Sequence, residues 1–132
     1  MKYLWLIAAF FSISAHAYTG QELLEDCRAA DEYLSAGKST DPEQSIKSAR
    51  CLSYLAGFAD SYAVSDYLAE SVGVRLNAFC LQKDPDLPMR LVRAVLIHLE
   101  RVPPGNAVST ATLVAGAFSK AFPCSNSLET KK

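Results

Sequence analysis

Four cysteines in a short chain place the strongest constraint on what this sequence can fold into. Cys27, Cys51, Cys80 and Cys124 are its only cysteines, and all lie beyond the first 17 residues. An even number of cysteines in a small exported protein is typical of disulfides. No C-x-x-C pair occurs, and His98 is the only histidine after residue 17, so we expect no metal site. The sequence therefore predicts two disulfides, with three pairings to choose from.

Export is indicated by the first 17 residues, which have the form of a secretory signal peptide. A basic start is followed by an apolar run from Tyr3 to Ile13 and by Ala15-His16-Ala17, a small-x-small cleavage pattern. The run is too short for a membrane span, although an uncleaved anchor helix is the alternative. We expect cleavage after Ala17, a periplasmic location, one domain over residues 18–124 and a flexible polar tail over 125–132.

The charge balance is close to neutral, with 13 Lys and Arg against 14 Asp and Glu. Such a balance gives no reason to expect nucleic acid or an anionic membrane surface as a partner. No membrane association is expected once the signal peptide is removed.

Helix start and stop signals divide the chain into four segments. Thr19 and Glu22 form a capping box, Asp41-Pro42 opens a second helix, and proline or glycine follows each expected helix end. The last helix is capped by Asn106 or Ser109, and no strand pattern occurs. The sequence predicts a compact all-α domain of two antiparallel helix hairpins, with helices over about 19–36, 42–72, 87–102 and 106–122.

Helix geometry selects one disulfide pairing. In an antiparallel hairpin of the first two helices, Cys27 and Cys51 lie opposite each other. Cys80 follows the far end of the second helix, which is about 31 Å from Cys51 at 1.5 Å per residue. A disulfide needs Cα atoms within about 7 Å, so Cys80 cannot reach either Cys27 or Cys51. Cys27–Cys51 and Cys80–Cys124 are therefore the predicted bridges.

The segment from Cys51 to Asp60 is the expected centre of the fold. Gly57 costs a helix about 1 kcal/mol relative to alanine, which predicts a close approach of another helix there. Asp60 lies among apolar residues and is expected to be an internal hydrogen-bonded tether. Tyr54, Phe58 and Tyr62 form a stripe at helical spacing that we expect in the core, or at an interface if it is exposed.

Residues able to carry chemistry are few. His98 has no nucleophile to activate once the cysteines are paired, and we expect it to be a structural residue. Arg90, Arg93 and Arg101 lie on one side of the third helix, where a solvated face is expected. We therefore expect no catalytic residue, no cofactor site and no enzymatic activity.

Several short motifs together resemble one known family. Cys51-x-x-Tyr54-x-x-Gly57-x-x-Asp60, Phe79-Cys80 and Phe122-Pro123-Cys124 occur in this order, with a Leu91, Val95 and Leu99 stripe between the last two. With Cys27 placed after Gly20, the pattern is similar to the Rap/Tai family of small periplasmic immunity proteins. The resemblance implies an all-helical, disulfide-bonded and often dimeric protein that neutralises a peptidoglycan amidase delivered by type VI secretion.

The resemblance and the lack of a catalytic constellation together favour an immunity protein that binds its cognate amidase and occludes the active site. Because loops on a rigid scaffold usually carry recognition, we expect the partner contacts in the loops at the two ends of the third helix. A small periplasmic stress chaperone, or another non-catalytic binding protein, is the alternative, and the resemblance also suggests a homodimer. The expected contact residues are Gln82, Lys83, Asp84, Asp86, Pro104, Gly105 and Asn106.

Overall fold

The computed structural model describes residues 17–37, 41–105 and 107–125, which form four helices and no strand. The all-α, four-helix prediction is thus confirmed. Residues 1–16 of the expected signal peptide, residues 126–132 of the expected tail and Asn106 lie outside the described residues. The helices are α2 (Gly20–Ala36), α3 (Pro42–Glu70), α4 (Leu87–Arg101) and α5 (Thr110–Ala121).

The helix starts follow the capping signals of the sequence. At α2, the Thr19 hydroxyl accepts a hydrogen bond from the Glu22 amide, and the Glu22 carboxylate accepts one from the Thr19 amide. The Asp41 side chain caps α3, whose first residue is a proline. Ser109, one of the two residues predicted for that role, caps α5 by accepting from the Thr112 amide. Each cap satisfies an amide that has no partner inside its helix.

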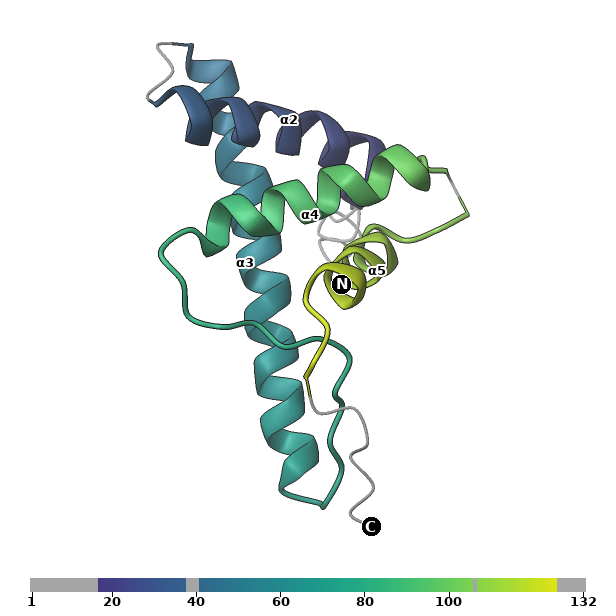
Figure 1. The fold of residues 1–132 in the computed structure, drawn as a ribbon. Coiled ribbons are helices and arrows are strands. Elements are labelled where there is room, and N and C mark those ends of the chain that lie inside the picture. The colour runs from purple at the N-terminus through teal and green to yellow at the C-terminus, as the bar shows by residue number, and fades with distance from the viewer. Residues whose placement is uncertain (1–16, 38–40, 106, 126–132) are drawn as a thin grey trace, which may run out of the picture.

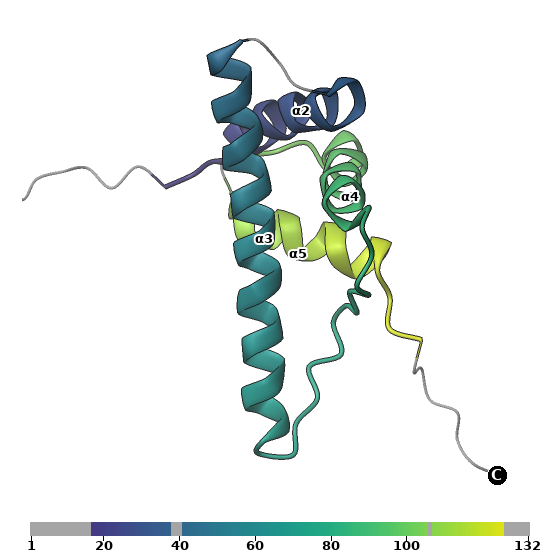
Figure 2. The ribbon, with the colours of Figure 1, turned by 90° about the vertical axis from the view of Figure 1, so that its left-hand side faces the viewer.

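The long helix α3 is the axis of the molecule (Figure 1). Helices α2 and α4 lie side by side across its N-terminal half, and α5 packs beneath α4. The C-terminal part of α3 extends well beyond the other helices, and the segment between α3 and α4 returns alongside it (Figure 2). Consecutive helices form the most extensive pairs, α2 with α3 and α4 with α5.

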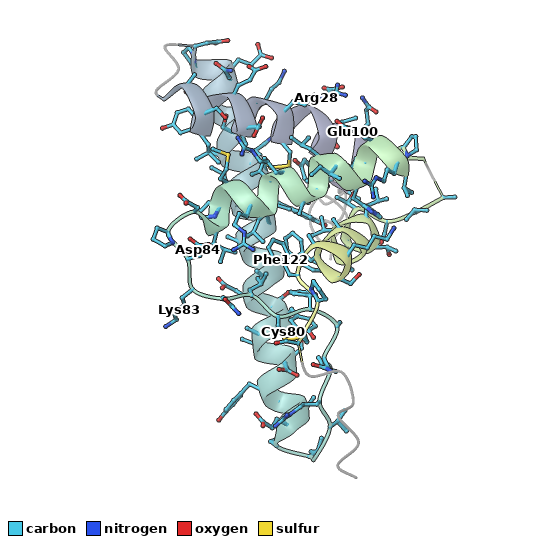
Figure 3. The ribbon with its side chains drawn as sticks, in the orientation of Figure 1. Arg28, Cys80, Lys83, Asp84, Glu100 and Phe122 are labelled. Atoms are coloured by element: carbon cyan, nitrogen blue, oxygen red, sulfur yellow. A yellow bond between two sulfur atoms is a disulfide. The ribbon has the colours of Figure 1, made fainter. Side chains whose placement is uncertain are left out.

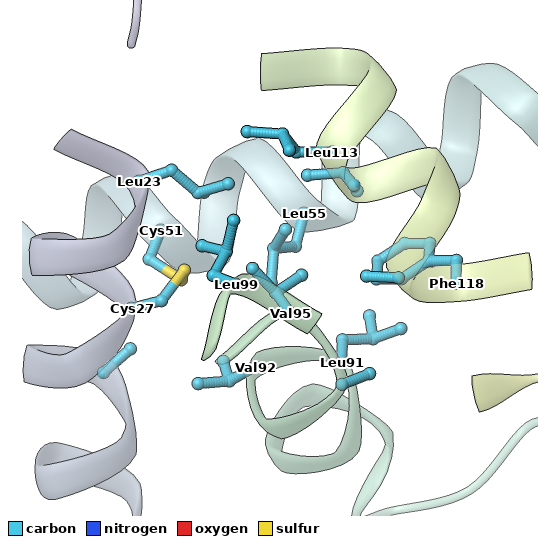
Figure 4. Packing of buried hydrophobic residues seen from close by; sticks show 14 of the residues in the cluster. Leu23, Cys27, Cys51, Leu55, Leu91, Val92, Val95, Leu99, Leu113 and Phe118 are labelled. Carbon is cyan, nitrogen blue, oxygen red and sulfur yellow. A yellow bond between two sulfur atoms is a disulfide. The ribbon is translucent and has the colours of Figure 1, made fainter. Parts of the chain in front are cut away.

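The hydrophobic core lies where all four helices meet, at the N-terminal half of α3 (Figure 4). Its largest fully buried apolar side chains come from every helix, which is why none of the helices can be removed without exposing the others. They are Leu23, Leu55, Val92, Val95, Val114 and Phe118.

Both predicted disulfides are present. Cys27 and Cys51 join α2 to α3 with Cα atoms 5.1 Å apart, and Cys80 and Cys124 are joined with Cα atoms 4.9 Å apart. The first bridge is completely buried among leucines and valines, whereas Cys80 is exposed to solvent. The pairing derived from helix geometry is therefore confirmed.

None of the helices within the described ranges combines the length and the apolar character needed to cross a bilayer.

Candidate partner-binding surface

The most unusual part of the surface is the end of α3 that extends beyond the other helices. Large apolar side chains are exposed along this end and along the turn that follows it, with Tyr67 at 73% and Val72 at 76% exposure. Single exposed apolar residues are common, but a group of them marks an interaction site. We call this group the apolar protrusion, and it consists of Val64, Tyr67, Leu68, Val72, Val74 and Leu76.

The turn of the apolar protrusion is held in place by hydrogen bonds to α3. Gly73 has a positive φ of 81°, which lets the chain reverse direction directly after the helix. The Leu76 amide donates to Asp66 Oδ1 at 3.0 Å, and the Ala78 amide donates to the Tyr62 hydroxyl at 2.7 Å. Buried support is scarce here, so these polar contacts fix how the apolar side chains are presented.

An aromatic cluster connects this turn to the core. The Phe79 ring stacks on Tyr62, with centroids 3.9 Å apart, and meets Phe118 edge-on at 5.4 Å. Phe118 in turn contacts Phe122 edge-on. The Cys80 amide donates to the Phe122 carbonyl at 2.9 Å, next to the Cys80–Cys124 bridge. The motif residues Phe79 and Phe122 therefore lie in one cluster through Phe118, and they fasten the protrusion to α5.

The first predicted contact loop, Gln82–Asp86, follows the apolar protrusion along the chain. Asp84 accepts hydrogen bonds from the Asp86 amide and from Arg90, each at 2.9 Å. These two bonds, the backbone one first, lower the pKa of the Asp84 carboxyl, so the carboxylate that accepts them stays ionised to lower pH. Gln82 is exposed, and Lys83 points away from the body of the molecule (Figure 3).

The second predicted loop lies elsewhere. Pro104 packs against the start of α2, so closely that a Cβ added to Gly20 would lie 2.8 Å from the Pro104 Cβ. The loop that contains Pro104 and Gly105 is separated from Asp84 by the whole of α4, about 22 Å for a helix of 15 residues. The structure therefore does not bring the two predicted loops together into one compact contact surface.

Two expectations for the centre of α3 are wrong. A Cβ added to Gly57 would meet nothing within 4 Å, so no helix crosses there. Asp60 is exposed rather than an internal tether, because it falls on the side of α3 that the other helices leave uncovered. Tyr54, Phe58 and Tyr62 are half-buried against the core, as their spacing predicted. Close helix contact occurs instead at Gly116 of α5, whose backbone lies against the His98 ring of α4.

The buried carboxylate is Asp26, which sequence reasoning missed. It is 1% exposed and accepts two hydrogen bonds from Arg50, at 2.8 Å each, and one from the Tyr18 hydroxyl at 2.7 Å. The sequence position of Asp26 does indicate burial, because Asp26 lies three residues after Leu23 and one before Cys27, on the same face of α2.

No catalytic arrangement is apparent among the described residues. His98 is buried in α4, and burial, followed by the charges of Lys120 and Arg101, lowers the pKa of its imidazole. All four cysteines are in disulfides, and no group of His, Cys, Asp and Glu in the described ranges could hold a metal ion. Arg90 and Arg93 form exposed ion pairs with Asp84 and Asp31, as a solvated helix face does.

Comparison with known protein families gives a match that spans nearly all of the described residues. A family model described as Rap1a immunity proteins matches residues 19–124, which includes every described helix and both disulfides. No match was found among curated proteins or among solved structures.

Proposed function

Since this chain belongs to the family of Rap1a immunity proteins, we propose that it binds a secreted peptidoglycan amidase and inhibits it by occluding the active site. The family supports a toxin-immunity role in general. The observation that carries the proposal further is the apolar protrusion, because an exposed apolar surface held by hydrogen bonds is suited to a protein partner. Inhibition by binding requires no catalytic group in the inhibitor.

We assign the toxin contact to the apolar protrusion together with the adjoining loop Gln82–Asp86. A projecting surface can enter a cleft, which is the shape that an amidase active site presents. Its apolar side chains would supply the buried centre of the interface, and Lys83 and the Asp84–Arg90 ion pair would lie at the polar rim. Pro104 and Gly105, at the other end of α4, are outside this surface.

Two substitutions on the same helix test this assignment. Leu68 and Ile46 are both 59% exposed, but Leu68 lies in the protrusion and Ile46 lies near the opposite end of α3. Leu68→Glu is expected to weaken binding of the cognate amidase by at least about tenfold, because a carboxylate would be desolvated in the interface. Ile46→Glu is the matched control and is expected to bind as the wild type does.

The measurement is survival of cells that receive a periplasmic amidase, together with the affinity of the purified pair. Candidate amidases are those encoded beside the gene for this protein. Equal protection by Leu68→Glu and Ile46→Glu would contradict the assigned surface. Full survival without the protein, for every candidate amidase, would contradict the immunity function itself.

We further propose that residues 1–17 are a signal peptide removed after Ala17, which places the protein in the periplasm. Tyr18 would then be the first residue of the mature chain. N-terminal sequencing of protein purified from the periplasm tests the proposal, and a start at any other residue would overturn the cleavage position.

The same exposed surface favours a second candidate, a periplasmic chaperone that binds unfolded proteins. Such a protein would suppress aggregation of unrelated clients without any amidase present, and Leu68→Glu would reduce this activity. A second copy of the chain is another partner that would fit the protrusion. In that case the wild type would sediment as a dimer and Leu68→Glu as a monomer.

A further inference from the structure

A small groove between α4 and α5 lies away from the apolar protrusion and has no role in the proposed function. Its volume is about 230 Å³. Its lining combines apolar residues with polar and cationic ones: Ala94, Ile97, Ala117 and Ala121 with His98, Arg101 and Lys120. A groove this size holds a few carbon atoms and one polar group.

The imidazole of His98 lines the groove and has no partner on the described part of the protein. His98 is 9% exposed, and no hydrogen bond or ion pair to its ring is found within the described residues. Among the described residues, every side-chain N or O atom that is fully buried has a hydrogen-bond partner. The ring nitrogens of His98 have none there, so they are not fully buried and reach solvent through the groove. A polar side chain that is nine-tenths buried ordinarily has a partner, so the partner of this ring, water or a ligand, must come from the groove.

Gly116 shows that this position of the ring is built into the packing. A Cβ added to Gly116 would lie 2.9 Å from His98 Nε2, closer than side chains pack. The glycine therefore lets the imidazole lie directly against the α5 backbone at the edge of the groove.

Two cations line the groove together with the imidazole. Arg101 lies in the last turn of α4 and Lys120 in the last turn of α5, and neither has an ion pair in the part of the chain described. Cations in a last turn interact favourably with the helix carbonyls, which accounts for their sequence positions. It does not account for their lining the same groove as an imidazole without a partner in the described protein, whose pKa is lowered by burial first and then by these two charges.

We propose that this groove binds a small organic carboxylate that carries a short apolar chain. The carboxylate would accept hydrogen bonds from Arg101, Lys120 and the ring N–H of neutral His98. The apolar chain would cover the exposed face of Ile97 and the alanines beside it. Inorganic phosphate would satisfy the three donors but would leave this apolar lining in contact with water.

Binding can be followed by NMR at the imidazole of His98, because His98 is the only histidine after residue 17 and gives a single imidazole signal. Hexanoate added to the mature protein, with both disulfides intact, is expected to shift that signal in a saturable way. Hexanamide has the same chain and no charge, and it is expected to bind at least about tenfold more weakly.

Two substitutions test the charged and the apolar contributions of the groove separately. Lys120→Gln is expected to weaken hexanoate binding about tenfold, whereas Lys47→Gln, a lysine of α3 outside both the groove and the toxin-contact surface, is the matched control and should leave it unchanged. Ile97→Ser should weaken binding of hexanoate but not of acetate. Both groove positions are exposed, so these variants are expected to fold.

Three results would overturn the proposal. They are the absence of a saturable shift at His98, equal binding of hexanoate and hexanamide, and equal binding by the wild type and Lys120→Gln. Binding of inorganic phosphate as tight as that of hexanoate would overturn the part of the proposal that requires an apolar chain. None of these results bears on toxin binding, because the groove and the protrusion share no residue.

Discussion

The Asp26 carboxylate joins three segments that are far apart in the chain. It lies on α2, receives Arg50 from α3, and receives the hydroxyl of Tyr18, which precedes α2. The Tyr18 ring also packs against Tyr54, with centroids 5.0 Å apart, and its carbonyl accepts from the Thr110 hydroxyl of α5. Burial, and then the hydrogen bond to Asp26, raises the pKa of Tyr18, so the phenol remains a donor at any physiological pH.

Neutralising Asp26 should therefore destabilise the fold. Asp26→Asn keeps the shape of the side chain but removes the charge, and we expect the free energy of unfolding to fall by about 2 kcal/mol. Urea denaturation measures the loss. Glu43→Gln, which disrupts an exposed ion pair with Lys47, is the control and should have little effect. Equal effects of the two substitutions would show that the Asp26 charge is not important for stability.

His98 makes stability depend on pH near neutrality. The groups facing it are Arg101 of α4 and Lys120 of α5, and with burial they hold its folded-state pKa below the ordinary 6.5. The unfolded chain therefore binds the proton more readily. The contribution of His98 to stability is complete above pH 6.5 and is lost as the pH falls from there through the folded-state pKa.

Denaturation at a series of pH values, for the wild type and for His98→Gln, measures this loss. The variant should show a flatter pH dependence just below pH 6.5, whatever its absolute stability. Parallel curves for the two proteins over that window would contradict the prediction.

The sequence pattern favours Asp60 as the buried carboxylate, but the carboxylate that is buried in the structure is Asp26. Both aspartates have apolar neighbours in the sequence, and both lie within helices. Burial of Asp26 depends on Arg50 and Tyr18, which reach it only after α2 has packed on α3. Local sequence does not contain that tertiary contact, so the prediction selected the wrong carboxylate.

Among the helices, two glycines in equivalent local settings should respond differently to alanine. Gly57→Ala in α3 meets open space, and we expect a gain of about 1 kcal/mol in the free energy of unfolding from helix propensity. Gly116→Ala in α5 would press on His98 and should lower stability instead. Thermal or urea denaturation of the two variants checks this. A destabilised Gly57→Ala would restore the close helix approach expected from the sequence.

Helix positions and disulfide pairing could be predicted because both depend on local rules. Caps and prolines fix the helix ends, and the rise per residue limits which cysteines can meet. The apolar protrusion could not be recognised in this way. The apolar arc of α3 looks the same along its length, and it shows which side is apolar but not where the covering helices stop. One signal was available, since Val74 and Leu76 continue the apolar pattern after the helix has ended.

Across the molecule as a whole, the two disulfides differ in how readily solvent and reagents can reach their sulfur atoms. Cys27 and Cys51 are fully buried, whereas Cys80 is exposed and Cys124 half-buried. Thiol–disulfide exchange requires a thiolate to reach a sulfur atom, so limited dithiothreitol should reduce the Cys80–Cys124 bridge first. Alkylation followed by mass spectrometry identifies the reduced pair, with urea-denatured protein as the control in which both bridges react. Reduction of both bridges at the same rate in the folded protein would contradict this.

The order of the bridges along the chain bears on how the protein reaches its oxidised form. Each cysteine is bonded to its nearest unpaired neighbour in sequence, Cys27 to Cys51 and Cys80 to Cys124. A chain that enters an oxidising compartment N-terminus first would present the cysteines in that same order. An oxidase that joins cysteines as they appear would then produce the native bonds directly, and a disulfide isomerase would have nothing to correct.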